Sequence, residues 1–166
     1  MDVITAIKTR RSIRQFKAKP ITKECLRDLI DAARFAPTAR AVQPWEFIII
    51  TNKDTLKKIG ELAENGRFVS GASSCIAVFS NDTKYYLEDC CAATENILLA
   101  ATAGGIASCW VAGDKKPYCQ TISALLDVPG SFKLVSLIAL GYPESEKEFK
   151  VADKRSIDEL IHWERY

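Results

Sequence analysis

NILLAATAGGIASCWVAG, residues 96–113, is an 18-residue run that contains no charged side chain. Its length would suit a helix that crosses a membrane. The pair Gly104–Gly105 divides the run, however, and alanines and small polar residues keep its hydropathy modest. Because glycine commonly ends a helix, we expect an alanine-rich buried helix up to the glycine pair, then a short strand, and no membrane span.

Apolar patterns on both sides of this run predict further helices and strands. The β-branched and aromatic stretch Trp45–Thr51 (WEFIIIT) indicates a strand in the centre of a sheet. A capping box at Ser156–Glu159 predicts that a terminal helix starts there. The expected helices cover residues 2–9, 22–36, 54–64, 84–103, 120–126 and 156 onward, and the expected strands cover 45–51, 75–80, 108–112 and 134–140.

The composition is that of an ordinary globular protein. The 166 residues are 48% hydrophobic with a net charge of +2, which excludes a disordered chain and gives no reason to expect nucleic acid or a membrane as partner. We expect one domain over residues 1–166. The opening MDVITAIKTRR has no apolar leader, so we expect a cytoplasmic protein with six reduced cysteines, most of them in the core. A single histidine and the lack of a Cys-x-x-Cys pair predict no metal site.

Residues 8–19 carry six positive charges and no acid. Arg10, Arg11 and Arg14 do not share one helical stripe, so a loop would bring them together with the Ser12 hydroxyl. Guanidinium groups bind phosphate through paired hydrogen bonds, which makes this segment a candidate phosphate site. A solvated basic surface is the alternative, and a nucleic-acid site is a weaker one because the overall charge balance is close to neutral.

Two further segments offer polar groups to a ligand. Pro37 and Pro44 bound a loop in which Thr38 and Gln43 present a hydroxyl and an amide that suit the edge of a planar heterocycle; a rigid helix-to-strand connection is the alternative. In the tail, Lys154–Arg155 precedes the expected terminal helix and would favour an anion, or would simply be surface charge. The chain has neither G-x-G-x-x-G nor G-x-x-x-x-G-K-[ST], so cationic side chains would have to hold any nucleotide.

The order of these motifs resembles that of the nitroreductase family of flavin-dependent oxidoreductases, of which this would be a short member. The motifs are RRSIRQF at 10–16, AP(T)xxxxQPWEF at 36–47, GGIASCWVAG at 104–113, and LGYP, DKR and HWERY from 140 to the C-terminus. The resemblance implies an α+β fold of three layers, α/β/α, with a mostly antiparallel central sheet flanked by helices. It also implies a homodimer with FMN in the clefts at its interface.

The resemblance also implies an activity and a set of binding residues. Hydride would pass from NADH or NADPH through flavin N5 to a nitroaromatic, a quinone or a similar small acceptor by a ping-pong mechanism, with no catalytic side chain; Arg14 would give electrostatic support. The matching positions are Arg10, Arg11 and Ser12 for phosphate and ribityl, Arg14 for the pyrimidine side, Pro37, Thr38 and Gln43 beside the ring of the other subunit, Asn65 as an amide contact, Trp110, Val111, Ala112 and Gly113 along the reactive edge, and Lys154 and Arg155 as a second phosphate clamp.

Two positions depart from the family's pattern in the proline-bounded loop. Ala41 stands where the family commonly has asparagine, and an unusual Arg40 precedes it. The missing amide leaves open an alternative function, a flavin-binding protein without NAD(P)H turnover.

Overall fold

A four-stranded antiparallel sheet forms the centre of the computed structural model, which describes residues 1–166. In order across the sheet, the strands are β1 (Trp45–Ile50), β2 (Ser74–Asn81), β4 (Phe132–Gly141) and β3 (Ala107–Ala112). All three strand pairs are antiparallel. The predicted mostly antiparallel sheet is confirmed.

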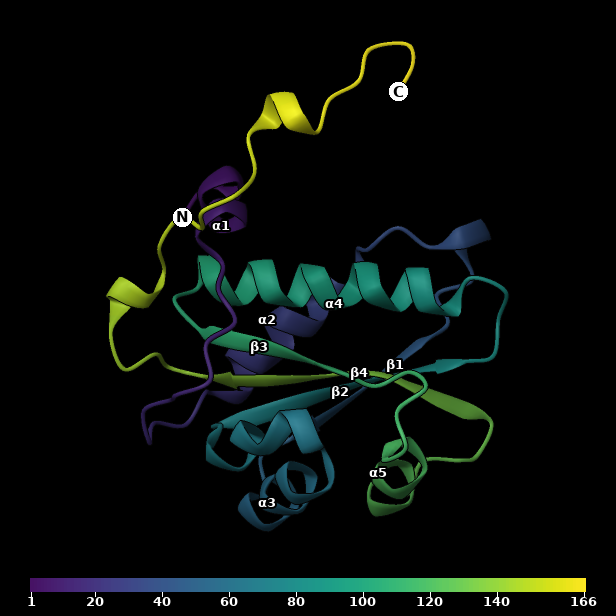
Figure 1. Cartoon of the computed structure of the whole chain (residues 1–166). Coiled ribbons are helices and arrows are strands. Elements are labelled where there is room, and N and C mark those ends of the chain that lie inside the picture. The colour runs from purple at the N-terminus through teal and green to yellow at the C-terminus, as the bar shows by residue number, and fades with distance from the viewer.

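Helices cover both faces of this sheet (Figure 1). The helices are α1 (Val3–Thr9), α2 (Lys23–Arg34), α3 (Lys53–Leu62), α4 (Tyr86–Ala103) and α5 (Cys119–Leu125). Leu26 and Leu29 of α2 and Ile97 of α4 belong to the core on one face, whereas Leu56 and Ile59 of α3 belong to a separate core on the other. The predicted three-layer α/β/α fold is therefore confirmed.

The run from residue 96 to 113 forms the two elements expected from its glycine pair. Helix α4 ends at Ala103, Gly105 takes a φ of 70° in the turn, and β3 begins at Ala107. Glycine adopts this left-handed conformation without the steric cost of a side chain. None of the helices combines the length and the apolar composition needed to cross a membrane.

Two predictions about the elements are wrong. Strand β1 lies at an edge of the sheet, not in its centre, and accordingly Glu46 and Ile49 are exposed. At the C-terminus, Ser156 makes no side-chain cap, and only a 3-10 turn at Ile157–Glu159 replaces the expected helix. This tail leaves the domain (Figure 1) and has no apolar surface to pack on, and short helices are rarely stable without packing.

Candidate functional site

The basic segment after α1 contacts the start of β3 at its outer edge and then the end of β4. Ser12 forms a parallel bridge with Ser108, and the Ile13 N–H donates to the Ser108 carbonyl at 3.0 Å. Further on, Phe16 bridges Pro143 next to the end of β4. These backbone contacts fix the arginines of the segment beside the sheet.

A cavity of about 510 Å³ opens beside this segment. Its lining includes Arg11, Ser12, Ile13, Arg14 and Gln15 from the basic segment and Lys147, Glu148 and Lys150 from the turn after β4. Four cations thus face a single carboxylate, so the cavity favours an anion. A capping box between Ser145 and Glu148 shapes that turn.

Sequence reasoning missed Lys147 and Lys150. They stand in the charged run ESEKEFK, residues 144–150, which reads as ordinary surface. The only local signal was the Ser145-x-x-Glu148 pattern, which indicates an ordered turn but says nothing about its neighbours.

Arg10, Ser12 and Arg14 converge on β3. Burial raises the pKa of the Cys109 thiol, and the charge of Arg14, the Ser12 hydroxyl and the charge of Arg10 each oppose that rise. The Arg14 guanidinium donates to the Ser12 carbonyl at 3.1 Å and lies 5.5 Å from the centre of the Phe68 ring. A nearby acid, Glu95 of α4, lies 3.7 Å from Arg10 Nε.

Asn65 lies in a 3-10 turn, Glu64–Gly71, that packs against β3. The contact is close at Gly66, where an added Cβ would lie 3.0 Å from Val111 Cγ1. The same turn carries Phe68, the ring below Arg14. The turn that carries Asn65 therefore contacts both β3 and Arg14, and the Asn65 side chain is exposed.

The last residues of β3 present backbone donors at the outer edge of the sheet. Gly113 donates to Val135 of β4, so the alternate residues Trp110 and Ala112 direct their backbone groups outward. No further strand lies beyond β3. The Tyr118 hydroxyl donates to the outward-facing Ala112 carbonyl. The outward-facing Ala112 N–H has no strand beside it and is therefore an open donor.

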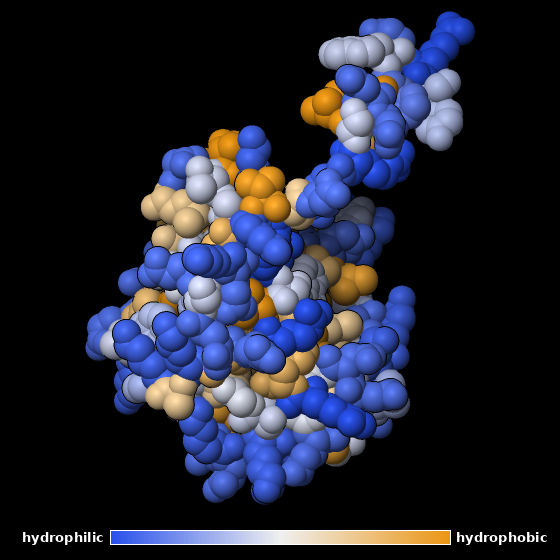
Figure 2. Space-filling model, turned by 60° about the vertical axis from the view of Figure 1, so that its left-hand side comes forward, coloured by the Kyte–Doolittle hydropathy of each residue, from blue (hydrophilic) through white to orange (hydrophobic).

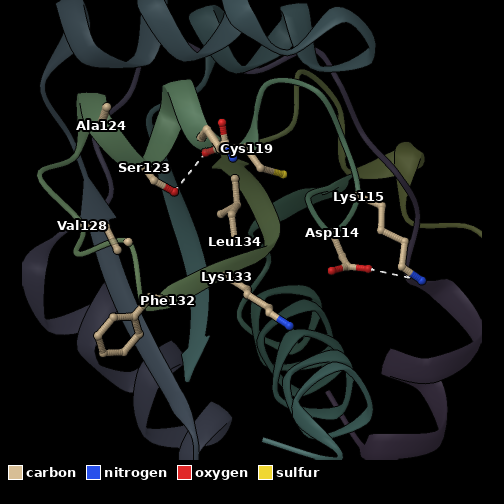
Figure 3. A pocket seen from close by; sticks show the side chains of 11 residues that line it. Asp114, Lys115, Cys119, Ser123, Ala124, Val128, Phe132, Lys133 and Leu134 are labelled. Atoms are coloured by element: carbon tan, nitrogen blue, oxygen red, sulfur yellow. Dashed lines mark hydrogen bonds and ion pairs between the residues drawn. The ribbon is translucent and has the colours of Figure 1, made fainter. Parts of the chain in front are cut away.

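A second cavity, of about 480 Å³, lies directly after this edge (Figure 3). Cys119 faces it from α5 and donates to the Gly113 carbonyl at 2.8 Å. Asp114 accepts from Tyr86 at 2.9 Å, which raises the pKa of Tyr86, and Lys133 pairs with Asp82 at 2.7 Å. Both lysines of the lining are paired with an acid, Lys115 with Asp114 and Lys133 with Asp82, so this cavity does not favour an anion as the first one does.

The loop with Pro37, Thr38 and Gln43 lies near the N-terminal end of α4 (Figure 1). Thr38 Oγ1 donates to Asp89 Oδ2 at 2.8 Å and accepts from the Gln43 N–H at 3.0 Å. Arg40, Ala41 and Gln43 all have positive φ values, between 51° and 56°. Within one chain this loop does not join the basic segment.

Lys154 and Arg155 also lie apart from the basic segment. Both are exposed on the C-terminal tail, where Arg155 pairs with Glu159 at 3.3 Å. Figure 1 shows this tail reaching away from the sheet. One chain thus brings together Arg10, Arg11, Ser12, Arg14, Asn65 and the Trp110–Gly113 segment, but not the loop or the tail cations.

Comparison with known proteins identifies the family. The family model described as "Putative TM nitroreductase" matches residues 2–166. The chain belongs to the nitroreductase family. A relative from Archaeoglobus fulgidus, named "Putative NADH dehydrogenase/NAD(P)H nitroreductase", is 37% identical over 99% of both chains.

Solved structures of other nitroreductases share the fold. A protein of the same name from Parabacteroides distasonis has a TM-score of 0.91 and 28% identity, covering 99% of this chain and 98% of its own. A nitroreductase from Desulfovibrio desulfuricans, described as a complex with FMN, has a TM-score of 0.85 and 26% identity, covering 100% of this chain and 98% of its own. The resemblance inferred from the motifs is confirmed.

Proposed function

We propose that this nitroreductase is an FMN-dependent oxidoreductase that carries hydride from NADH or NADPH to a small acceptor such as a nitroaromatic or a quinone. One observation carries the proposal: the cationic cavity at Arg11, Ser12 and Arg14 lies at the start of β3, and the outer backbone edge of the same strand is open at Ala112. The FMN complex of the Desulfovibrio relative and the NAD(P)H nitroreductase name of the Archaeoglobus relative support it.

The residues of the cavity fit the phosphate of FMN. Arg11, Lys147 and Lys150 exceed the single acid Glu148, and the Ser12 side chain is exposed. Charge-assisted hydrogen bonds from such groups contribute about 1.5–3 kcal/mol each when formed. FAD would also need a site for its adenosine, and the chain has no glycine-rich dinucleotide motif to hold it.

Bound FMN supplies a ring that accepts hydride from the nicotinamide donor and gives it to the acceptor in a second half-reaction. The chain contributes binding, orientation and electrostatics. The Ala112 N–H is available as a donor to the reactive edge, and Arg14, with Asn65 nearby, favours negative charge on the pyrimidine side. The reaction then needs no nucleophilic side chain.

Residues that one chain leaves apart would meet in a homodimer. Pro37, Thr38 and Gln43, together with Lys154 and Arg155, would reach the cavity of the second copy. Exposed apolar side chains support such an interface, and Figure 2 shows them on the N-terminal helix and the tail. They include Val3, Ile4 and Ile7 of α1 and Ile157, Leu160, Ile161 and Trp163 of the tail.

The alternative is a flavin-binding protein without turnover, and Ala41 is the feature that favours it. The two functions differ in one measurement: NADH or NADPH should bleach the visible flavin band under anaerobic conditions, and an acceptor should restore it. A flavin band that neither donor bleaches would refute the oxidoreductase.

Titration of the apo-protein by flavin fluorescence tests the cofactor. FMN should bind at least tenfold more tightly than riboflavin, because one charge-assisted contact to phosphate is worth about that factor. Raising the salt concentration should reduce the affinity for FMN and leave that for riboflavin nearly unchanged. Equal affinities for the two flavins would refute the phosphate site.

A further inference from the structure

The exposed loop between α2 and β1 has a backbone conformation that its residues disfavour. Arg40, Ala41 and Gln43 have φ values of 56°, 56° and 51°, in the left-handed region that suits glycine. These three side chains and that of Val42 are exposed, so packing of the loop tip does not explain its shape. The loop therefore needs a restraint from elsewhere in the chain.

Asp89 of α4 provides this restraint. Its carboxylate accepts the Thr38 hydroxyl at 2.8 Å and the Ala39 N–H at 3.1 Å. The Thr38 oxygen in turn accepts the Gln43 N–H at 3.0 Å, so its own proton is directed to Asp89. A relay of hydrogen bonds thus runs from the backbone of Gln43 through Thr38 to the carboxylate.

Asp89 is buried, so its carboxylate needs the hydrogen bonds of this relay. The residue is 6% exposed, and none of the chain's ion pairs includes it. A buried carboxylate without a cation depends on the hydrogen bonds that it accepts. Loss of one bond in the relay therefore affects both the carboxylate and the loop that it holds.

If Asp89 only stabilised the fold, the loop that it holds would not need a strained backbone. An ordinary connection between α2 and β1 would satisfy the carboxylate equally well, whereas here the relay fixes left-handed residues whose side chains are exposed. Strained backbone that the surrounding structure maintains is concentrated at functional sites. The shape of the loop tip therefore serves a contact outside this chain.

We propose that Asp89 is a positioning residue that acts through Thr38 to hold Gln43 and its neighbouring backbone in the shape that contacts a flavin ring bound by a second copy of the chain. The inference rests on the proposed function for the identity of that ring. The Thr38 hydroxyl then holds the loop, and Gln43 makes the contact.

The first measurement reports the loop itself, in the full-length protein. Trypsin cleaves after Arg40 only when the loop opens, and the cleavage rate of the wild-type protein is the reference. Relative to that reference, Asp89→Asn and Thr38→Val should speed cleavage after Arg40 about tenfold, the effect of losing one charge-assisted hydrogen bond. Thr38→Ser keeps the hydroxyl and should behave like wild type, as should Asp28→Asn, an exposed acid on α2 outside the relay.

The second measurement reports the flavin. Asp89→Asn and Thr38→Val should weaken FMN and riboflavin by the same factor, about tenfold, and shift the visible flavin spectrum, because the loop contacts the ring and not the phosphate. Thr38→Ser should restore both properties. Circular dichroism and thermal unfolding of each variant show that it is folded.

Three results would overturn the inference. Unchanged cleavage in Asp89→Asn and Thr38→Val would show that the relay does not hold the loop. Faster cleavage with unchanged flavin affinity and spectrum would show that Asp89 holds the loop but does not position it for the flavin. A wild-type protein that binds neither flavin would refute the proposed function together with the role toward the ring, and the cleavage comparison would still report separately whether Asp89 restrains the loop.

Discussion

Ala41 has a φ of 56°, a conformation that costs a residue with a Cβ about 1–2 kcal/mol. Asparagine tolerates this region better than alanine does, and it is the residue common at this position in the pattern that the chain resembles. Ala41→Asn should therefore raise the free energy of unfolding by about 1 kcal/mol and also strengthen flavin binding through its amide. Urea unfolding and flavin titration measure the two effects.

Ala18→Asn is a suitable control for that substitution. Ala18 is also exposed in a loop, but its φ is not positive, so asparagine there should leave stability and flavin binding unchanged. If Ala41→Asn changed neither property, both the strain at position 41 and its place beside the ring would be contradicted.

Cys75 and Cys90 show how single buried groups set the response to pH. Burial raises the pKa of Cys75 to about 12 and that of Cys90 to about 11. In the unfolded chain a thiol ionises near pH 8.5, so above this pH the unfolded state loses protons that the folded state keeps. These two thiols contribute their full stability below the unfolded pKa and lose it as the pH rises toward their folded pKa.

The free energy of unfolding should accordingly fall between about pH 9 and pH 11, by up to about 1.4 kcal/mol per pH unit for each thiol. Urea unfolding under reducing conditions at several pH values measures the slope. A Cys75→Ala, Cys90→Ala double variant should be less stable at pH 7 but show a flatter alkaline decline. An equally steep decline in that variant would assign the effect to other groups.

The turn after β4 matters at the scale of an element, because it brings Lys147 and Lys150 to the basic segment. Both lysines are exposed, so each contributes little, up to about 1 kcal/mol. The double variant Lys147→Ala, Lys150→Ala should weaken FMN about tenfold at low salt, with a smaller effect at high salt and none on riboflavin. Fluorescence titration at two salt concentrations measures this change.

Lys57 and Lys58 on α3 offer a matched control for this pair. They are two exposed lysines that do not line the cavity. Replacing both with alanine should leave the affinity for FMN unchanged at either salt concentration. A loss equal to that of the Lys147 and Lys150 variant would indicate a general effect of net charge and not a local phosphate site.

At the scale of the whole molecule, exposed apolar groups lie on α1 and on the C-terminal tail. Ile4 of α1 is 56% exposed and Trp163 of the tail is 84% exposed. We expect a homodimer that buries these groups over more than about 2,000 Å² in total. Sedimentation at micromolar concentration should give twice the chain mass of 18.4 kDa.

Removing residues 151–166 tests the contribution of the tail to that dimer. Apart from the half-buried Ala152, these residues are exposed, so the truncated chain should keep the circular dichroism of the domain while its dimer dissociates. The full-length protein is the control. A stable, folded monomer of the full-length chain at micromolar concentration would contradict the dimer.

The sequence by itself determined the elements and the family. Apolar periodicity and the Gly104–Gly105 pair predicted the helices and strands of the domain, because burial and backbone freedom act on neighbouring residues. The order of the arginine, proline and glycine motifs gave the family. The sequence also predicted that a loop after the first helix would bring the arginines around Ser12 together, because these residues are close in the sequence. In the structure that loop contacts β3 at Ser108.

Only the tertiary structure decided which strand lies at the edge and which distant residues meet. The composition of β1 predicted a central strand because it shows only how apolar the strand is. Which strands lie beside β1 depends on the path of the whole chain. Asp89 reaches Thr38 across 51 positions, and Lys147 lines the same cavity as Arg11 although the two lie near opposite ends of the chain. The capping pattern at Ser156 predicted a helix that does not form. A short helix is rarely stable unless it packs against the rest of the protein.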